Sequence, residues 1–311
     1  MQQSQASLST HLKAYFFLLL TALIYGGNVI AGRLIAGDVP PLTLSAIRVL
    51  LALVILLPLA WSQLKDAPKP SKLELLQLIV MSILGITIPY VSLLLGLQHT
   101  TGTNASVIFA TLPAVTNTLI FLLYKLKPSK FQTFGMITSF LGLLIVFTHG
   151  SILQLLTFKL GIGESYLFLN VLSIGLFNLM GQKIMKKFSS LVTSVYALIF
   201  AAIMLIPMGV WQLRTTQWNV SISEWLIILY MGFLAAGVAF FLNLYGIDKI
   251  GSGKASIFNN LQHVFSITLS VIILKESLVL YHWVGFLFVI SGVVLSLAPS
   301  PSHRIKTKTN P

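Results

Sequence analysis

Residues 104–113 read NASVIFATLP and residues 254–263 read KASIFNNLQH, so an Ala-Ser pair recurs after 150 positions. The same shift, applied without a gap, pairs further identical residues along the chain. The pairs are Asn28 with Asn178, Thr43 with Thr193, Ala52 with Ala202, Met81 with Met231, Gly96 with Gly246, Lys125 with Lys275, Gly135 with Gly285 and Gly142 with Gly292. Because one register holds throughout, we predict two repeats, residues 1–150 and residues 151–311, the second ending in a short basic tail.

The composition excludes a soluble domain. Of 311 residues, 56% are hydrophobic and only 9% are charged, whereas soluble proteins carry about 25% charged residues. A helix needs about 20 apolar residues to cross a bilayer, and the chain has ten such runs. They lie near 13–34, 40–61, 75–97, 102–124, 131–149, 162–184, 190–212, 223–246, 253–274 and 281–298. We therefore predict an all-α membrane protein with ten transmembrane helices.

The basic residues predict how these runs are oriented. If the N-terminus is cytoplasmic, 15 of the 20 Lys and Arg residues fall in cytoplasmic segments, 4 fall outside, and Arg48 lies within the second run. Lys and Arg are enriched on the cytoplasmic side of membrane proteins, so both termini are expected in the cytoplasm, at the inner (plasma) membrane. The same bias accounts for most of the net charge of +13 without a nucleic-acid partner. The lipid bilayer is the expected surrounding, and the assembly is a monomer or homodimer.

Each repeat contains five runs, which is an odd number. The second repeat must therefore be inverted in the membrane relative to the first, and the aligned residues Lys125 and Lys275 fall on opposite sides. Inverted repeats that surround a binding site near the midplane are a recurring design of secondary transporters. The repeat indicates a transporter that works by alternating access.

Two stretches resemble a known family over nearly the whole chain. YGGNVIAGRLIAGDVPPLTLSAIRVLLA (25–52) and KESLVLYHWVGFLFVISGVVLSL (275–297) are similar to signatures of the EamA-type branch of the drug/metabolite transporter superfamily. Tyr25 stands where Trp is common, and Arg48 stands at the family's usual Arg. The resemblance implies a carrier that exports small organic metabolites, such as amino acids. It also implies that spans 1, 3, 4, 6, 8 and 9 line a central cavity, with spans 5 and 10 supporting the bundle.

The chain departs from the family pattern in two places. The family expects Glu in both halves, but Lys125 is followed by Leu126 where Lys275 is followed by Glu276. The family also tends to place Pro midway through spans four and nine. Pro113 keeps this feature and predicts a kink or hinge in span four, whereas span nine has His263 at the aligned position.

Span nine carries a polar stripe within an apolar helix. At 100° per residue, Ser256, Asn259, Asn260, His263, Ser266 and Ser270 fall within an arc of about 120°, with Gln262 on its flank. Unsatisfied polar groups cost several kcal/mol in lipid, so the stripe must face protein or a water-filled cavity. We interpret Asn259, His263, Asn260 and Gln262 as substrate contacts. The alternative is interhelical hydrogen bonding, worth about 0.6 kcal/mol per bond.

Other residues are candidates for the same cavity or for helix packing. Asn28 and Asn178 occupy symmetric positions and either face the cavity or pack among small residues, and Tyr90 and Asn243 are candidate lining residues. Gly135 with Gly142 and Gly285 with Gly292, each seven residues apart, are interpreted as packing faces. Arg48 could bind an anionic group, but we interpret it as structural, reaching the outer surface or meeting Asp38 there.

The acidic residues bear on ion coupling. All seven lie in loops or near the ends of spans, so we expect no buried carboxylate for a proton or sodium ion, and His263 is the best-placed titratable group. The chain has no cysteine, which excludes thiolate metal sites, and no metal or cofactor is expected. No catalytic constellation occurs, so we predict that the protein is not an enzyme. A nucleoside or cationic-drug carrier, or a non-transporting receptor, is the alternative function.

Overall fold

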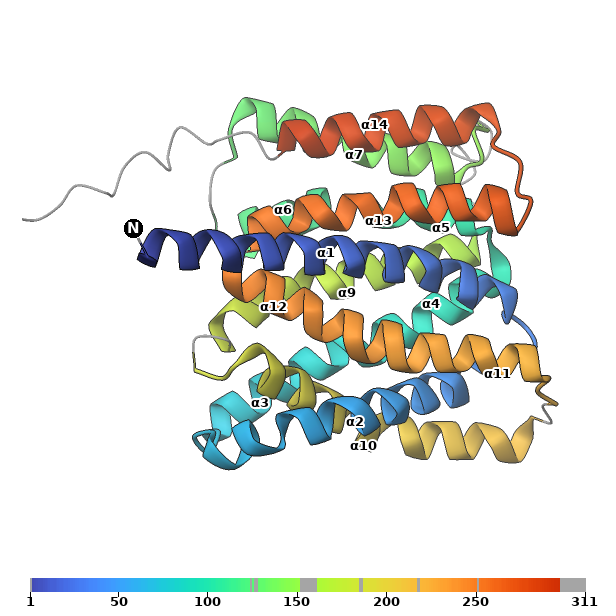
Figure 1. The fold of residues 1–311 in the computed structure, drawn as a ribbon. Coiled ribbons are helices and arrows are strands. Elements are labelled where there is room, and N and C mark those ends of the chain that lie inside the picture. Colours follow the sequence, from blue (N-terminus) through green and yellow to red (C-terminus); the bar gives the residue numbers. More distant parts are fainter. Residues whose placement is uncertain are drawn as a thin grey trace, which may run out of the picture.

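The computed structural model describes residues 2–123, 125, 128–151, 161–184, 187–216, 219–250 and 252–296, with all of their side chains except those of residues 2–11, 147, 181–183, 252–260 and 296. These residues form helices, joined by turns and short extended segments, and no strand (Figure 1). The helices of the first half are α1 (Gln2–Leu34), α2 (Pro41–Asp66), α3 (Lys72–Ser82), the π-helix η1 (Ile83–Thr87), α4 (Ile88–His99), α5 (Gly102–Phe109), α6 (Leu112–Leu123) and α7 (Lys130–Phe147). Those of the second half are α9 (Ile162–Ile184), α10 (Ser190–Thr215), α11 (Ile222–Leu229), the π-helix η2 (Tyr230–Ala239), α12 (Phe240–Ile250), α13 (Ser252–Ile273) and α14 (Leu280–Ser296).

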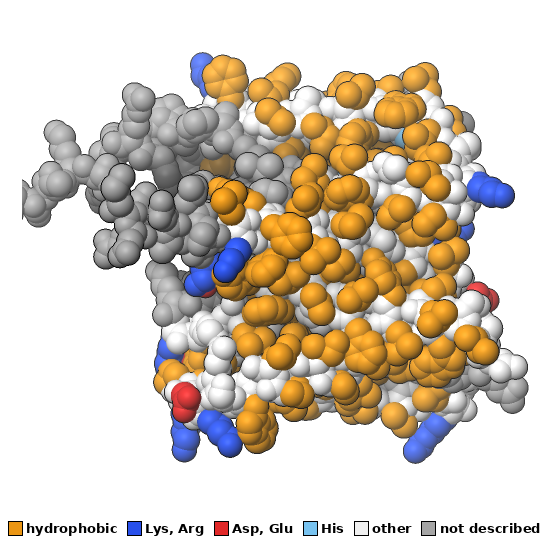
Figure 2. Space-filling model, viewed as in Figure 1, with side chains coloured by type: hydrophobic (Ala, Val, Ile, Leu, Met, Phe, Trp, Pro, Cys, Tyr) orange, Lys and Arg blue, Asp and Glu red, His pale blue; other side chains and the backbone are white. Residues whose placement is uncertain are grey.

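The apolar runs form long helical segments that lie alongside one another. Seven segments of the described chain are long and apolar enough to cross a membrane, and three shorter apolar helices lie in the other expected runs. Figure 2 shows hydrophobic side chains covering the middle of the visible surface, with Lys and Arg confined to its margins. The all-α membrane fold is confirmed, and the count of ten spans stays a prediction. The seven segments are Leu12–Leu34, Pro41–Asp66, Lys72–His99, Gly102–Leu123, Ile162–Met180, Ser190–Thr215 and Ile222–Ile250.

Details of the backbone recur at the 150-residue spacing seen in the sequence. Ser71 and Ser221 each begin a helix with a capping box, in which the serine and the Glu three residues later bond to each other's backbone N–H groups. The π-helices η1 and η2 follow these helices in each half. Lys125 and Lys275 both adopt positive φ, at 52° and 55°. The repeat therefore extends to caps and turns.

The helices of the two halves pack in reciprocal pairs. The first span of the first repeat, α1, packs on α13, the fourth span of the second, and α9 correspondingly packs on α5 and α6. Equivalent helices also pack on each other, α2 on α10 and α7 on α14. Figure 1 shows α7 and α14 beside one another at the upper edge of the bundle. This exchange of partners is the pattern that two inverted repeats predict.

Close approach of α7 and α14 depends on the four glycines singled out in the sequence. A Cβ at Gly142 would lie 2.6 Å from the carbonyl oxygen of Gly285, and a Cβ at Gly292 would overlap the backbone nitrogen of Ser139 and lie 2.5 Å from the oxygen of Gly135. Glycines at such positions let two helix backbones approach each other in a membrane.

The fourth span is broken where Pro113 predicts a kink. Helix α5 ends at Phe109, a turn occupies Ala110 and Thr111, and Pro113 lies in the first turn of α6. Proline is tolerated there because the first helical N–H groups have no intrahelical partner.

Glu276, in the segment between α13 and α14, caps the N-terminus of α5. Its carboxylate accepts hydrogen bonds from the backbone nitrogens of Gly102 and Thr103, both at 2.9 Å, and from the hydroxyl of Thr103 at 2.6 Å. Negative charge at a helix N-terminus satisfies free N–H groups and complements the helix dipole. The family's Glu at this position thus joins one repeat to the other.

We expect Glu276→Ala to lower the melting temperature of the purified protein by about 2–8 °C. The estimate combines about 1–2 kcal/mol for a lost helix cap with a shift of about 2–4 °C per kcal/mol. Glu276→Gln keeps one acceptor oxygen and should lie between wild type and Glu276→Ala. If all three proteins unfolded at the same temperature, the carboxylate would not hold α5 in place.

Candidate functional site

A cavity of about 150 Å³ lies at the centre of the bundle. Its wall comes from α1, α2, η1, α4, α5 and α6 of the first half and from α9, η2, α12 and α13 of the second half. These helices belong to spans 1, 3, 4, 6, 8 and 9, the set that the family resemblance implies, with span 2 added by Arg48. The described residues of α7 and α14 do not line it. Both repeats therefore build one shared site.

The structure brings most of the predicted substrate contacts to this wall. Their side chains come from five helices that are distant in sequence. The substrate role of each remains a prediction. The six residues on the wall are Asn28, Tyr90, Asn178, Asn243, Gln262 and His263.

Two predicted contacts cannot be placed in the same way. The backbone of Asn259 and Asn260 belongs to α13, but their side chains lie outside the described residues.

Arg48 lies on the cavity wall, so the interpretation that it reaches the surface or meets Asp38 is wrong. Only 2% of the residue is exposed. Its Nε donates to the carbonyl oxygen of Met231 at 3.4 Å, and its Nη2 donates to Oδ1 of Asn28 at 3.2 Å. Its guanidinium carbon lies 4.1 Å from the centre of the Tyr90 ring, within the range of a cation–π interaction. These contacts hold the guanidinium group inside the bundle.

One guanidinium nitrogen of Arg48 makes no hydrogen bond with the described residues. Nη1 is buried and has no hydrogen-bond partner among the described residues. A buried polar donor that makes no hydrogen bond costs about 1–3 kcal/mol, more when it is charged. An anionic group in the cavity would provide the missing acceptor.

His263 also has a buried nitrogen that lacks a hydrogen-bond partner among the described residues. The residue is 3% exposed and lines the cavity, and its Nδ1 is buried without a partner among the described residues. An imidazole nitrogen donates or accepts according to its tautomer. Two residues of the cavity wall, Arg48 of span 2 and His263 of span 9, thus each have a buried nitrogen without a partner among the described residues.

The rest of the wall is largely apolar. Phe109, Phe177 and Phe240 line it together with Leu93. A Cβ at Gly85 would overlap the ring of Phe177, so this glycine makes room for an aromatic wall. Among the described lining residues, Arg48 is the one Lys, Arg, Asp or Glu. The arrangement suits a small molecule with an apolar body and one anionic end.

The polar stripe of span nine divides into two parts. Gln262 and His263 line the cavity, whereas Ser266 faces α5, with its hydroxyl oxygen 2.5 Å from that of Ser106. Ser270 is fully buried, and its hydroxyl would lie 2.7 Å from a Cβ at Gly102, also in α5. The part of the stripe whose side chains the structure describes avoids lipid as expected, and Ser266 and Ser270 pack between helices.

The sequence analysis overlooked two buried polar residues of α9. Asn170 lines the cavity and donates from Nδ2 to the carbonyl oxygen of Pro89 at 2.6 Å. Glu164 is only 2% exposed, so the expectation that the chain has no buried carboxylate is wrong. Glu164 lies in the first turn of α9, where an acidic residue is ordinarily a solvent-exposed complement to the helix dipole, and this hid its burial.

Comparison with known proteins identifies the class of molecule that builds this cavity. The model of the EamA-like transporter family matches residues 12–148 and again residues 161–298. The chain belongs to the EamA-like transporter family. The two matches cover most of each half, so this EamA-like transporter carries two copies of the family's unit.

Two relatives of this EamA-like transporter are similar over most of their length. The uncharacterized transporter YetK of Bacillus subtilis (strain 168) is 28% identical, with 91% of this chain and 86% of YetK covered. The uncharacterized transporter YyaM of the same organism is 27% identical, with 96% and 98% covered. A solved crystal structure superposes with a TM-score of 0.58 at 14% identity, covering 89% of this chain and 98% of that one, which supports the fold alone. The chain is a multi-pass membrane transporter.

Proposed function

We propose that this EamA-like transporter is a secondary carrier that exports small organic metabolites, such as amino acids, across the inner membrane. Its termini lie in the cytoplasm, and the central cavity binds the solute. Alternating access follows from the reciprocal packing of two repeats around one site.

The observation that carries the proposal is that Arg48, a residue of the cavity wall, has a buried Nη1 without a hydrogen-bond partner among the described residues. The other two donors of the side chain already hold Asn28 and Met231, so the guanidinium is positioned before a ligand arrives. A carboxylate is the acceptor that matches a guanidinium best, because charge-assisted hydrogen bonds are about twice as strong as neutral ones. A solute with one carboxylate would satisfy this atom and neutralise the buried charge.

The size and lining of the cavity define the rest of the solute. A cavity of about 150 Å³ holds a molecule of roughly the size of benzene. Phe109, Phe177 and Leu93 favour an apolar body. His263 Nδ1 offers a second polar contact, which suits the amino group or another hydrogen-bonding group of the solute. A monocarboxylate with a short apolar side chain fits these conditions.

The alternative cargoes fit less well. A cationic drug would meet the buried charge of Arg48 without a carboxylate among the described lining residues to offset it. A nucleoside lacks an anionic group and is larger than the cavity as it stands. A receptor or subunit that transports nothing would not need a cavity shared between two inverted repeats.

Solute flux through the purified protein in proteoliposomes tests the proposal. The panel contains labelled neutral amino acids, other monocarboxylates, a nucleoside and a cationic dye, with protein-free liposomes as the control. We expect flux for at least one carboxylate and none for the cationic dye. Flux of the nucleoside or dye alone would replace the proposed substrate class, and no flux of any solute would contradict the carrier function.

His263→Ala should weaken binding of the transported solute by about 5- to 10-fold, because one neutral hydrogen bond contributes about 1 kcal/mol. The affinity is measured from the concentration dependence of flux. Val264→Ala is the matched control, since Val264 is the next residue of α13 and is 48% exposed on the outer face of the bundle. Equal affinities of the two variants for the solute would show that His263 does not contribute to solute binding.

A further inference from the structure

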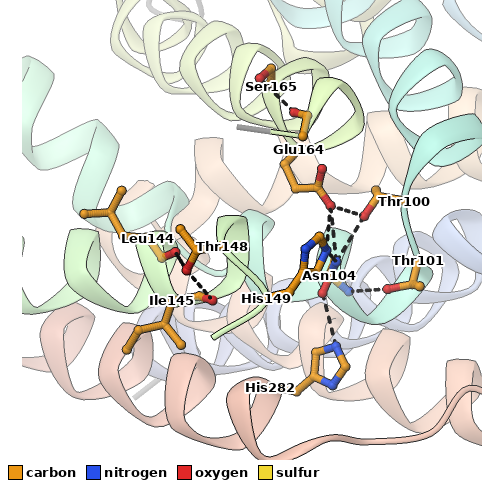
Figure 3. A network of polar contacts seen from close by, with 11 residues as sticks. Thr100, Thr101, Asn104, Leu144, Ile145, Thr148, His149, Glu164, Ser165 and His282 are labelled. Carbon is orange, nitrogen blue, oxygen red and sulfur yellow. Dashed lines mark hydrogen bonds and ion pairs between the residues drawn. The ribbon is translucent and has the colours of Figure 1, made fainter. Parts of the chain in front are cut away.

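A second polar cluster lies beyond the cavity, at the end of the bundle opposite the N-terminus of α1 (Figure 3). Its centre is the carboxylate of Glu164. The hydroxyl of Thr100 donates to Oε1 of Glu164, and Nδ2 of Asn104 donates to the same oxygen at 3.2 Å. Nε2 of His149 lies 3.6 Å from it. These residues come from α4, α5, α9 and the segment after α7, so the cluster joins the ends of several helices.

The hydrogen bonds fix the direction of the network. The backbone N–H of Val279 donates to Nδ1 of His282 at 3.0 Å, so this imidazole carries its proton on Nε2 when it is neutral. Nε2 of His282 then donates to Oδ1 of Asn104 at 3.1 Å. The amide of Asn104 is thereby oriented with Nδ2 toward Thr100, at 3.1 Å, and toward Glu164. Glu164 is thus held as an acceptor of two fixed donors.

His149 is the member of the cluster that reaches solvent. Its side chain is 44% exposed, whereas that of Glu164 is 3% exposed. Nε2 of His149 also lies 3.2 Å from Nδ2 of Asn104, so an unprotonated Nε2 shares one of the two amide N–H groups with the other acceptors. A protonated Nε2 instead gives Glu164 a cationic partner. The exposed ring of His149 is thus the contact between the buried carboxylate and the solution.

Other titratable groups near the cluster have their own contacts. Arg33 of α1 donates to the carbonyl oxygen of Leu97 at 2.7 Å, and Glu276 caps α5. Tyr281 of α14 packs its ring against that of His149, with centres 5.8 Å apart. His99, at the end of α4, lies against Gly163 of α9. Among the described residues, His149 is the one basic group that forms an ion pair with Glu164.

The cluster sits on helices that also line the cavity. Along α9, Glu164 precedes the lining residue Asn170 by six residues, and along α4, Thr100 follows the lining residue Leu93 by seven. At 1.5 Å per residue the cluster lies about 10 Å from these lining positions. The distribution of Lys and Arg places this end outside the cell. Opening the cavity to the outside between α4, α5 and α9 must separate the members of the cluster.

We propose that Glu164 and His149 form a proton-binding site of this carrier, and that a proton bound there from the outer solution holds the outer end of the cavity closed. This proposal rests on the proposed carrier function, and it means that transport by this carrier is coupled to protons. The chemistry is a proton transfer from hydronium in the outer solution to Nε2 of His149, which leaves water, followed by an ion pair with the Glu164 carboxylate. Because the carboxylate of this pair is buried, solvent screens the pair less than it screens two fully exposed charges.

The absence of cysteine gives a direct test. Leu93→Cys places one thiol on the cavity wall, and Thr216→Cys, in a separate protein, places one on the exposed segment after α10 at the same end. Proteoliposomes with the outer face exposed are labelled with a membrane-impermeant thiol reagent at external pH 7.5 and 5.5, with internal pH held at 7.5. Dividing the Leu93→Cys rate by the Thr216→Cys rate removes the effect of pH on thiol reactivity.

We expect the normalised labelling of Leu93→Cys to fall about threefold or more at external pH 5.5, because the proposed site takes its proton from the outer solution. Glu164→Gln and His149→Gln, added singly, should abolish this fall. His263→Gln should leave it unchanged, which separates this site from the histidine of the cavity. Size-exclusion profiles and melting temperatures verify that each variant is folded.

Three outcomes would overturn the proposal. They are a wild-type labelling ratio that does not depend on external pH, a dependence that survives both Glu164→Gln and His149→Gln, and a Leu93→Cys thiol that is never labelled from outside. Labelling requires no solute, so the two proposals are separable. Flux without pH-dependent labelling would overturn the proton site alone, whereas pH-dependent labelling without flux of any solute would contradict the carrier function.

Discussion

Arg48→Met is expected to reduce flux of the transported carboxylate by about 10- to 100-fold. The variant removes a charge-assisted hydrogen bond to the solute, worth about 1.5–3 kcal/mol, and each 1.4 kcal/mol corresponds to a factor of ten. The measurement is the initial rate of flux in proteoliposomes at a solute concentration below saturation.

The fold should survive this change. Replacing a buried charge by an apolar side chain of similar length is often neutral or stabilising, so the melting temperature of Arg48→Met should stay close to that of wild type. Arg48→Lys is the informative control. Lysine keeps the charge but lacks the planar guanidinium group that bonds Asn28, Met231 and the solute together. The flux through Arg48→Lys should therefore lie between those through wild type and Arg48→Met. Wild-type flux through a folded Arg48→Met protein would contradict the claim that Arg48 binds a carboxylate of the solute.

Gly292→Ala is expected to cause a large loss of stability. The added Cβ would overlap the backbone nitrogen of Ser139 and lie 2.5 Å from the oxygen of Gly135, and a backbone cannot yield as a flexible side chain does. Overpacking of this kind costs about 1–3 kcal/mol, which corresponds to a fall in melting temperature of about 2–12 °C. The helix pair α7 and α14 should separate first.

Gly237→Ala provides the same substitution without the clash. A Cβ there would lie 3.4 Å or more from Ala52 and its other nearest neighbours, which is ordinary contact. Since Ala is favoured over Gly within a helix by about 1 kcal/mol, Gly237→Ala should match or exceed wild-type stability. Thermal unfolding of both purified variants checks the pair. Similar melting temperatures for the two would show that the α7–α14 contact does not depend on the glycine at 292.

The sequence predicted the fold because its signals are local or periodic. Apolar runs of the length of a membrane span locate helices, and the 150-residue register locates equivalent positions such as Ser71 and Ser221, whose matching caps the structure shows. The stripe of span nine could be placed away from lipid by helical geometry alone. The same register placed Asn28 and Asn178 at symmetric positions, and the structure, not the sequence, places both on the cavity wall rather than among packed small residues.

The polar contacts of Arg48 and Glu164 could not be predicted in this way. Arg48 two turns into an apolar span is compatible with reaching the surface or with facing inward, and the choice is made by Asn28, Tyr90 and the carbonyl of Met231 on three other helices. Glu164 resembles an ordinary acidic residue at a helix start. Its burial depends on partners from α4, α5 and the segment after α7, which only the packed bundle brings together.

Blocking the cavity tests most directly the claim that it is the solute site of a carrier. Ile174, on α9, lines the cavity, and Ile174→Trp would fill it. Leu169→Trp is the matched control, because Leu169 is on the same helix and is 44% exposed. The measurement is the flux, through each folded variant in proteoliposomes, of a carboxylate that wild type transports. We predict that Ile174→Trp abolishes flux while Leu169→Trp transports like wild type, and flux through Ile174→Trp at the wild-type rate would contradict the account.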